Sequence, residues 1–354
     1  MFYPMKFRPI YKNYFWGGRS FEKLGRQLPA GVVAESWEVS CRPEGMSILS
    51  NGKFEGIPLV ELFKDYSMQI KGYKFNEDEA ADFPLLIKYI DAKDNLSVQV
   101  HPDDYYVQTH KSEKYGKNEM WYIISAIPGS RLIHGVLPGI TREDLALAIS
   151  QGRVESCLKK IEVSAGDIIY VPSGLVHAIG SGIMLAEIQQ NSDTTYRVFD
   201  FNRTDAENNK RPLHIERALE VIDYNNHNIK EKYRGLDIRL SNDSFKTILI
   251  ANDCFVVEKY DISDKIKEKT DGSRFYIYLF LQGNGIIADE SGFTAVKEGE
   301  SVLIPAALGE YTIEGNLQAL KTYVPDIRHD VLQPLRSSGY SDDEIFSEIG
   351  GLRY

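Results

Sequence analysis

Cysteine and long hydrophobic runs are scarce in this sequence of 354 residues. The three cysteines, Cys41, Cys157 and Cys254, are far apart and include no CxxC pair, which argues against a disulfide framework and a thiolate metal site. No run approaches the roughly 20 apolar residues that span a bilayer, and the first residues lack the apolar stretch of a signal peptide. We therefore expect a cytoplasmic protein with no membrane partner.

Basic charge is also in short supply. The chain has 41 Lys and Arg against 51 Asp and Glu, so its formal net charge is −10. Binding to a nucleic-acid backbone depends on clustered basic side chains that release counterions, and we therefore expect no nucleic-acid partner. A small anion can still bind at a local basic cluster. The oligomeric state is left open.

Glycine and aromatic residues, by contrast, are abundant. The counts of 28 Gly, 21 Tyr and 16 Phe favour strands joined by tight turns. Apolar patterns over residues 32–56 and 83–101 predict strands. Helices are predicted over 59–63, from Thr141, whose hydroxyl can cap the following turn, and near 215–222. The sequence therefore predicts a strand-rich frame with inserted helices.

A weak internal repeat divides the chain. The spacing from Gly166 through Pro172 to His177 recurs from Gly299 to Glu310, and a strand-like segment ending in a turn precedes each copy. Two related β-barrels follow from this pattern. We place one domain at 1–232 and the other at 233–354. Because Glu310 stands at the place of His177, we expect metal chemistry in the first domain only.

Four potential metal ligands lie on or beside predicted strands. Gln99 and His101 are two residues apart, so their side chains share one face of a strand. With Glu119 and His177 they form a set of two imidazoles, a carboxylate and a neutral amide, which suits a borderline divalent ion such as zinc. Taken alone, His177 could equally be a rim histidine and Gln99 a satisfied polar strand residue. Two histidines and one carboxylate also suit non-haem iron.

These residues belong to a series of motifs that occur in a fixed order. The run GDIIYVPSGLVH at 166–177 resembles the second motif of cupin barrels. The other motifs are WGG at 16–18, ESWE at 35–38, LSVQVHPDD at 96–104, KNEMW at 117–121 and EIQQNSDTTYR at 187–197. Over about the first 205 residues this series resembles the type I mannose-6-phosphate isomerases (phosphomannose isomerases) of the cupin superfamily, in their short bacterial form.

The resemblance implies a mainly β fold with two cupin-like (jelly-roll) β-barrels, the second without a metal site. It also implies an enzyme that holds one Zn²⁺ per chain and interconverts D-mannose 6-phosphate and D-fructose 6-phosphate through a metal-stabilised enediol. The small phosphorylated sugar would be its partner. His101, Glu119 and His177 match the zinc ligands of the family, and Gln99 matches an amide ligand of some members.

The same resemblance assigns roles to further residues. Arg197 and Glu187 match catalytic positions, and Lys117 matches the lysine two residues before the ligand glutamate. Arg203 stands where the family has a lysine, which preserves a basic side chain that can contact phosphate. Arg203 and Ser97 are the expected substrate-binding residues.

The chemistry of the residues agrees with these roles. An aldose becomes a ketose when a proton leaves the carbon beside the carbonyl and returns to the neighbouring carbon. Glu187 is a reasonable base, and Lys117 or Arg197 can stabilise or relay charge. Arg197 and Arg203 could grip a phosphate, because the guanidinium fork matches its oxygens. Which group does what stays open, since such residues also form structural ion pairs.

Two other functions compete with isomerisation. One is a non-catalytic sugar-binding or regulatory cupin, and the other is an iron-dependent cupin oxygenase. The block from Glu187 to Arg197 argues against both, because a binding protein needs no base and an oxygenase needs no phosphate clamp.

Overall fold

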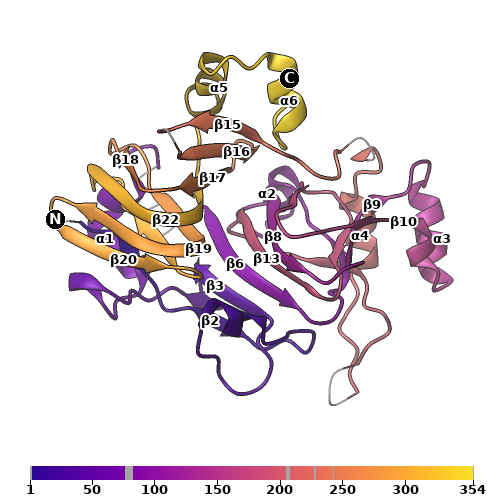
Figure 1. Cartoon of the computed structure of the whole chain (residues 1–354). Coiled ribbons are helices and arrows are strands. Elements are labelled where there is room, and N and C mark those ends of the chain that lie inside the picture. Colours follow the sequence, from indigo (N-terminus) through magenta and orange to yellow (C-terminus); the bar gives the residue numbers. More distant parts are fainter. Residues whose placement is uncertain (1, 76–82, 205–207, 227–228, 242, 354) are drawn as a thin grey trace.

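Strands dominate the computed structural model, which describes residues 2–75, 83–204, 208–226, 229–241 and 243–353. They form sheets of nine, six, five and two strands, and every pairing between the named strands is antiparallel (Figure 1). The predicted mainly β class with inserted helices is confirmed. The candidate site depends on how these sheets are layered.

The first half of the chain builds two facing sheets. Their strand orders are β11-β8-β13-β6-β3-β2 and β10-β9-β12-β7-β14. Apolar side chains of both sheets meet in one core, where Trp121 and Leu185 of the first pack with Leu132 and Ile179 of the second. The bounds of the strands are β2 Ile10–Lys12, β3 Glu35–Val39, β6 Leu85–Ala92, β7 Val98–Val100, β8 Glu119–Ala126, β9 Arg131–Val136, β10 Leu158–Glu162, β11 Ile168–Val171, β12 His177–Ile179, β13 Ile183–Gln190 and β14 Tyr196–Phe199. A separate two-stranded sheet consists of β4 Cys41–Arg42 and β5 Gly45–Met46.

The second half repeats this plan with longer strands. The order β21-β19-β22-β17-β16-β15 corresponds strand for strand to the six-stranded sheet, while β20 on β19 and β18 on β22 supply the facing layer. Each of the two long strands therefore serves both layers. The bounds are β15 Leu236–Arg239, β16 Phe245–Ala251, β17 Val256–Ile262, β18 Lys265–Lys269, β19 Tyr276–Asp289, β20 Gly292–Lys297, β21 Ser301–Ile304 and β22 Glu310–Tyr323.

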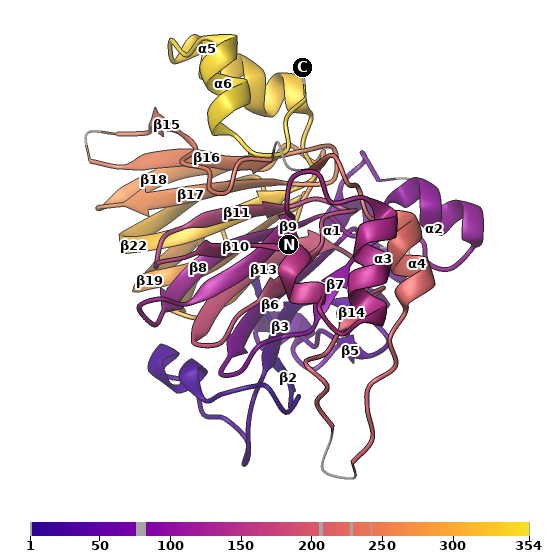
Figure 2. The same cartoon turned by 90° about the vertical axis from the view of Figure 1, so that its right-hand side faces the viewer.

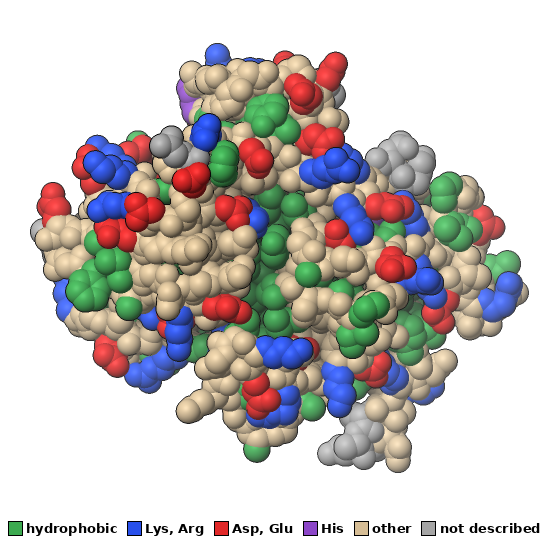
Figure 3. Space-filling view, in the orientation of Figure 1, with side chains coloured by type: hydrophobic (Ala, Val, Ile, Leu, Met, Phe, Trp, Pro, Cys, Tyr) green, Lys and Arg blue, Asp and Glu red, His purple; other side chains and the backbone are tan. Residues whose placement is uncertain are grey.

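A shared apolar core joins the two halves. Ile87 and Ile188 of the six-stranded sheet are fully buried in the same cluster as Ile277 and Leu320 of the nine-stranded sheet and Phe63 of helix α1. Strand β1 (Met5–Lys6) also pairs with β21, so the start of the chain crosses the boundary predicted after residue 232. On the face in Figure 3, apolar side chains gather along a furrow between the halves.

Helices cover the ends and one outer face of the molecule. Apolar residues of α3 and α4 pack on the five-stranded sheet, whereas α5 and α6 sit against β15 and β16 (Figure 2). Thr141 caps α3 by accepting a hydrogen bond from the Asp144 amide, as predicted. No helix in the described ranges has the length and apolarity to cross a membrane. The α-helices are α1 Leu59–Lys71, α2 Asp104–His110, α3 Arg142–Ser150, α4 Ile215–Val221, α5 Gln333–Ser337 and α6 Asp342–Glu348. The shorter turns are 3₁₀ segments at Ser20–Leu24, Gly52–Phe54 and Val154–Cys157 and a π segment at Ile327–Leu332.

Candidate metal centre and its cavity

Three strand ends bring His101, Glu119 and His177 together. His101 directly follows β7, Glu119 begins β8, and His177 begins β12, which pairs with β7 so that His177 faces Gln99. The turn before His177 depends on Gly174, which has φ of +82°, and a Cβ there would lie 3.1 Å from a backbone oxygen of Val221. The Pro-x-Gly spacing thus fixes where the histidine emerges.

The three side chains converge at close range and are almost completely buried. His101 Nε2 lies 3.1 Å from Glu119 Oε1, and His177 Nε2 lies 3.7 Å from Glu119 Oε2. Among the described residues this is the set of His, Cys, Asp or Glu side chains whose donor atoms can meet at one ion, since its atoms lie within 4.8 Å of one another. The geometry brings together the three ligands that the sequence predicts.

Backbone carbonyls orient both imidazoles. His101 Nδ1 lies 2.8 Å from Thr194 O, and His177 Nδ1 lies 2.9 Å from Leu175 O. A proton on each Nδ1 donates to its carbonyl, which leaves the Nε2 lone pairs directed at Glu119. Burial lowers the pKa of His101, with help from the charge of Lys117, and burial with the charge of His101 lowers the pKa of His177 to about 3. Both rings are therefore neutral, as metal ligation requires.

Glu119 lacks directed partners for its charge. Burial raises its pKa, but the positive charge of Lys117, with help from the adjacent imidazoles of His101 and His177, outweighs that effect and holds the pKa well below the ordinary value. Lys117 Nζ lies 2.9 Å from Oε1, yet neither carboxylate oxygen accepts a well-directed hydrogen bond within the described part of the chain. An orphaned buried carboxylate beside two neutral imidazole nitrogens fits a divalent cation.

Gln99 stands at the edge of this set. Its Nε2 lies 3.3 Å from His177 Nε2, and its Oε1 accepts a 3.4 Å hydrogen bond from Ser97. Rotation of the amide by half a turn exchanges the two atoms and directs the oxygen, the ligating atom, toward His177. Gln99 is thus close enough to take part in the site.

A cavity of about 360 Å³ adjoins the centre and is large enough for a small ligand. Five residues predicted from the sequence line it, namely Ser97, Gln99, Lys117, Glu187 and Arg197. Several other residues that line the cavity were not predicted from the sequence to belong to the site, among them Tyr14, Glu35, Lys88, Asp193 and Arg211. A lysine within the apolar run FPLLIKYI was the available signal for Lys88. No spacing in the sequence singled out Arg211.

Glu187 belongs to a buried ionic network on one wall of the cavity. It accepts a 2.9 Å hydrogen bond from Trp121 Nε1, and Lys88 Nζ lies 3.3 Å from its other oxygen and 3.7 Å from Glu35. Burial and the charge of Glu119 raise the pKa of Glu187 to about 7, although Lys88 and Lys117 oppose them. A carboxyl with a pKa near neutrality suits general base catalysis.

The two predicted arginines have different surroundings. Arg197 lines the cavity, where its Nε donates to Ser97 Oγ at 3.3 Å and its Nη1 donates to Pro212 O at 2.9 Å. Arg203 is not among the residues that line this cavity, and its guanidinium bonds to Asp200 and Asn95 instead. The structure therefore brings Arg197, but not Arg203, to the cavity wall.

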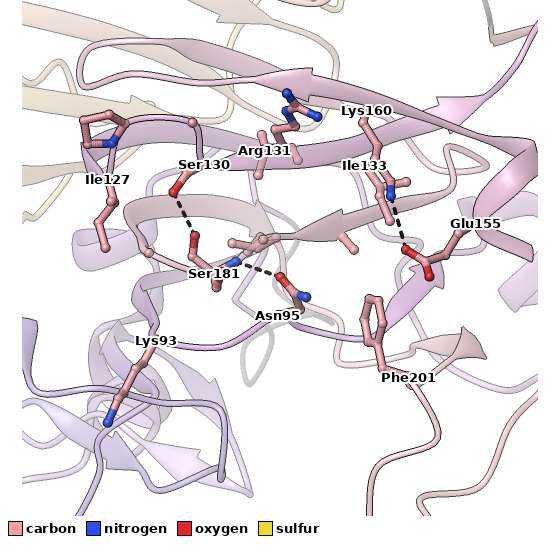
Figure 4. Close-up of a pocket in the computed structure, with 17 residues that line it drawn as sticks. Lys93, Asn95, Ile127, Ser130, Arg131, Ile133, Glu155, Lys160, Ser181 and Phe201 are labelled. Carbon is pink, nitrogen blue, oxygen red and sulfur yellow. Dashed lines mark hydrogen bonds and ion pairs between the residues drawn. The ribbon is translucent and has the colours of Figure 1, made fainter.

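A larger cavity of about 500 Å³ lies at the opposite ends of β8 and β12. Figure 4 shows turns of the first half around it, with Ser181 bonded to Asn95 and Lys160 paired with Glu155. It contains neither a histidine nor a carboxylate that lacks a partner. Size alone would favour this cavity, but the convergent ionisable groups identify the smaller one as the candidate site.

Comparison with known proteins yields the same family for both halves. Residues 5–124 match "Phosphomannose isomerase type I, catalytic domain", and residues 245–324 match "Mannose-6-phosphate isomerase, cupin domain". The chain is 35% identical to mannose-6-phosphate isomerase ManA of Bacillus subtilis over 91% of its own length and 99% of that protein. It is 37% identical to mannose-6-phosphate isomerase of Streptococcus mutans over 87% of the chain and 94% of the relative.

Solved structures agree with these sequence matches. The crystal structure of mannose 6-phosphate isomerase from Bacillus subtilis superposes with a TM-score of 0.82 at 30% identity, covering 90% of this chain and 99% of that one. A protein from Archaeoglobus fulgidus, described as a possible mannosephosphate isomerase, gives a TM-score of 0.70 at 19% identity, covering 90% and 96% of the two chains. The second likeness shows the fold alone.

Proposed function

Because this chain belongs to the type I phosphomannose isomerase family, we propose that it interconverts D-mannose 6-phosphate and D-fructose 6-phosphate in the cavity beside His101, Glu119 and His177. One observation carries the proposal, which is that a base, Glu187, and a fixed cation, Arg197, line the same cavity next to a buried set of metal ligands. Neither a sugar-binding protein nor an oxygenase accounts for all three groups.

The metal is proposed to be one Zn²⁺ per chain, held by His101, Glu119, His177 and Gln99. Two neutral imidazoles with one carboxylate are a common ligand set of catalytic zinc, and the amide oxygen of Gln99 completes four ligands. When bound, such an ion supplies Lewis-acid polarisation of a sugar oxygen. The proposal is supported by the buried Glu119 oxygens, which lack directed hydrogen bonds from the described residues.

The proton transfer is assigned to Glu187. As a carboxylate it takes the proton from the carbon beside the sugar carbonyl and returns it to the former carbonyl carbon, while the hydroxyl proton of the first carbon moves to the former carbonyl oxygen, so the reaction needs no external oxidant. Trp121 and Lys88 hold the two carboxylate oxygens, which orients the base. Lys117, 2.9 Å from Glu119, is proposed to stabilise negative charge that develops on the sugar oxygens.

Substrate contacts are proposed for Ser97 and Arg197, and Arg203 stays a prediction from the sequence. Ser97 and Arg197 are bonded to each other on the cavity wall, whereas support for Arg203 comes from the sequence resemblance. The division into a catalytic unit at 1–232 and a second cupin-like unit without metal at 233–354 is also a proposal, as is a cytoplasmic location. The free thiols of Cys157 and Cys254 are consistent with a reducing compartment.

A coupled assay tests the function directly. Purified protein is incubated with mannose 6-phosphate, and fructose 6-phosphate is measured with a linked enzyme. Isomerisation is expected; binding without turnover would favour a sugar-binding protein, and consumption of oxygen would favour an oxygenase. Either result would overturn the proposal.

Metal removal tests the cofactor. Dialysis against a chelator should abolish turnover, and one equivalent of zinc should restore it. Full activity in protein that contains no metal by elemental analysis would exclude a metal role. Restoration by iron but not by zinc would refute zinc as the cofactor.

A further inference from the structure

Three arginines gather around one carboxylate at the rim of the cavity. Asp200 Oδ1 accepts hydrogen bonds of 2.6 Å from both Arg203 and Arg211, and Asp200 Oδ2 accepts one of 2.8 Å from Arg211. Burial lowers the pKa of Arg197. The nearby charge of Arg211 lowers this pKa further, and the charge of Asp200 raises it. Three guanidinium groups thus stand beside two carboxylates, Asp200 and Asp94, whose Oδ2 lies 3.8 Å from Arg203 Nη1, which leaves a local surplus of positive charge.

All three guanidinium nitrogens of Arg203 form hydrogen bonds within the protein. Its Nε donates to Asp200 O at 3.2 Å, its Nη2 to Asp200 Oδ1, and its Nη1 to Asn95 O. Its central carbon lies 4.9 Å from the ring centre of Phe15 and 5.2 Å from that of Phe201. With three nitrogens bonded and aromatic rings beside it, Arg203 acts as a support for Asp200.

Arg211 is held in the same way but faces the cavity. Two of its nitrogens form a fork on Asp200, and its central carbon lies 5.1 Å from the centre of the Phe15 ring. Its third nitrogen, Nη1, donates no hydrogen bond within the described ranges, and Arg211 lines the cavity together with Arg197. Nη2 of Arg197 is likewise without an acceptor among the residues that the structure describes.

The geometry points to Arg197 and Arg211 as the pair that binds the phosphate group of the substrate, with Arg211 rather than Arg203 supplying the second guanidinium. Both arginines line the cavity, and each has one guanidinium nitrogen without an acceptor among the described residues. Guanidinium N–H groups match phosphate oxygens. Asp200 and Phe15 are positioning residues that fix the plane of Arg211. The cavity wall carries four basic side chains, Lys88, Lys117, Arg197 and Arg211, against the three carboxyl groups of Glu35, Glu187 and Asp193. This inference rests on the proposed function and names the group that recognises its substrate.

The test compares three single substitutions, Arg211→Ala, Arg203→Ala and Arg217→Ala, the last being an exposed arginine on the neighbouring helix α4. Steady-state kinetics with mannose 6-phosphate are measured alongside calorimetric titration with inorganic phosphate. Arg211→Ala should raise KM and the Kd for phosphate by about ten-fold or more, with kcat within about three-fold of wild type. Arg203→Ala should have the smaller effect on both constants, and Arg217→Ala should leave them unchanged.

The two readouts separate this inference from the proposed function. Suppose that the wild-type protein does not isomerise mannose 6-phosphate, and that Arg211→Ala weakens phosphate binding while the other two variants do not. The proposed function is then wrong, but the phosphate site is supported. If wild-type protein turns over normally and Arg203→Ala weakens phosphate binding as much as or more than Arg211→Ala, the inference is overturned. Should Arg211→Ala fail to fold by circular dichroism, Arg211→Gln replaces it with the same expectation.

Discussion

The two halves of the molecule share one plan and differ in what fills their interiors. The order β11-β8-β13-β6-β3-β2 corresponds to β21-β19-β22-β17-β16-β15. Even an irregularity recurs, because one residue is left unpaired in β8 at Ile124 and in β19 at Leu281. The strand frame is therefore the same, and the chemistry depends on the side chains that point inward.

Each half places a lysine opposite a glutamate on its two central strands, but the two residue types exchange places between the halves. Lys88 is paired across strands with Glu187 in the first half, while Glu258 is paired with Lys321 at the matching place in the second. Lys321 is surrounded, with its Nζ 2.6 Å from Glu268 and 3.9 Å from the ring centre of Tyr276. The second half thus satisfies its buried charges internally.

Tyrosines occupy the place of the metal ligands in the second half. The spacing of the repeat predicts Glu310 where the first half has His177, but 81% of the Glu310 side chain is exposed. The next residue, Tyr311, points inward and bonds to the Tyr278 hydroxyl at 2.9 Å. Strand alternation explains the difference, since a shift of one residue moves a side chain to the other face.

The two interiors differ in whether their buried polar groups have partners. Glu119 and two neutral histidines in the first half lack sufficient partners and adjoin a cavity, whereas Tyr278 and Lys321 in the second half are buried and have partners. A buried polar group without a partner is costly, so a protein retains it where a ligand completes it. The predictions that follow test this distinction in order of expected effect.

The largest effect is expected from the ligand histidines. His101→Ala or His177→Ala should lose bound metal and lower kcat/KM by about 10⁴-fold, or about 5 kcal/mol, because the ion is no longer held at the cavity. Elemental analysis and the coupled assay measure both quantities. Tyr311→Phe in the second half and His110→Ala on the surface should retain metal and turnover. Stoichiometric metal in either ligand variant would refute the assignment.

The next effect concerns the base. Glu187→Gln should lower kcat by about 10³-fold, about 4 kcal/mol, with metal content unchanged. A pKa raised to about 7 means that the carboxylate form is lost as the pH falls through neutrality, so kcat/KM of the wild type should decline below about pH 7. The variant should lack that decline. If kcat/KM of Glu187→Gln still declined below about pH 7, the decline would belong to another group.

The repeat was predictable because its spacing is local, and the ligand set was predictable because each ligand lies in a short motif that resembles one family. A helix beginning at 59 follows from its apolar spacing, and the fixed distance from Gly166 to His177 encodes one turn between two strands. The roles of Lys88 and Arg211 were not predictable from spacing, because each depends on partners far along the chain. Glu187 lies about one hundred residues beyond Lys88, and only the sheet register brings them together.

The third prediction moves to the second half. Lys321→Met should lower the free energy of unfolding by about 3 kcal/mol, because it leaves the carboxylate of Glu268 without its buried partner. Chemical denaturation measures this loss. Lys267→Met, an exposed lysine on the same sheet, is the control and should change stability by less than about 0.5 kcal/mol. Loss of metal in the folded Lys321→Met protein would contradict the separation of the two interiors.

The smallest expected effect is a pH dependence of stability. Burial raises the pKa of Glu258, but Lys246 and Lys321 outweigh it and lower the pKa below 4.5. The native state then binds fewer protons than the unfolded state, so the stabilisation is complete above about pH 4.5 and is lost as the pH falls through the folded-state pKa. Glu258→Gln should reduce the slope of unfolding free energy in this acid range by up to about 1.4 kcal/mol per pH unit. An identical slope in wild type and variant would show that Glu258 does not cause the pH dependence of the unfolding free energy.

The pairing of β1 with β21 has a consequence for how the molecule is made. Lys6 and its partner Glu300 are separated by 294 positions in the chain. At the usual pace of translation, the first strand waits roughly 15 to 60 s on the ribosome before its neighbour is synthesised. The fully buried Met5 side chain is uncovered during that time. The pairing of the first strand with β21 can therefore form only after most of the chain has been synthesised.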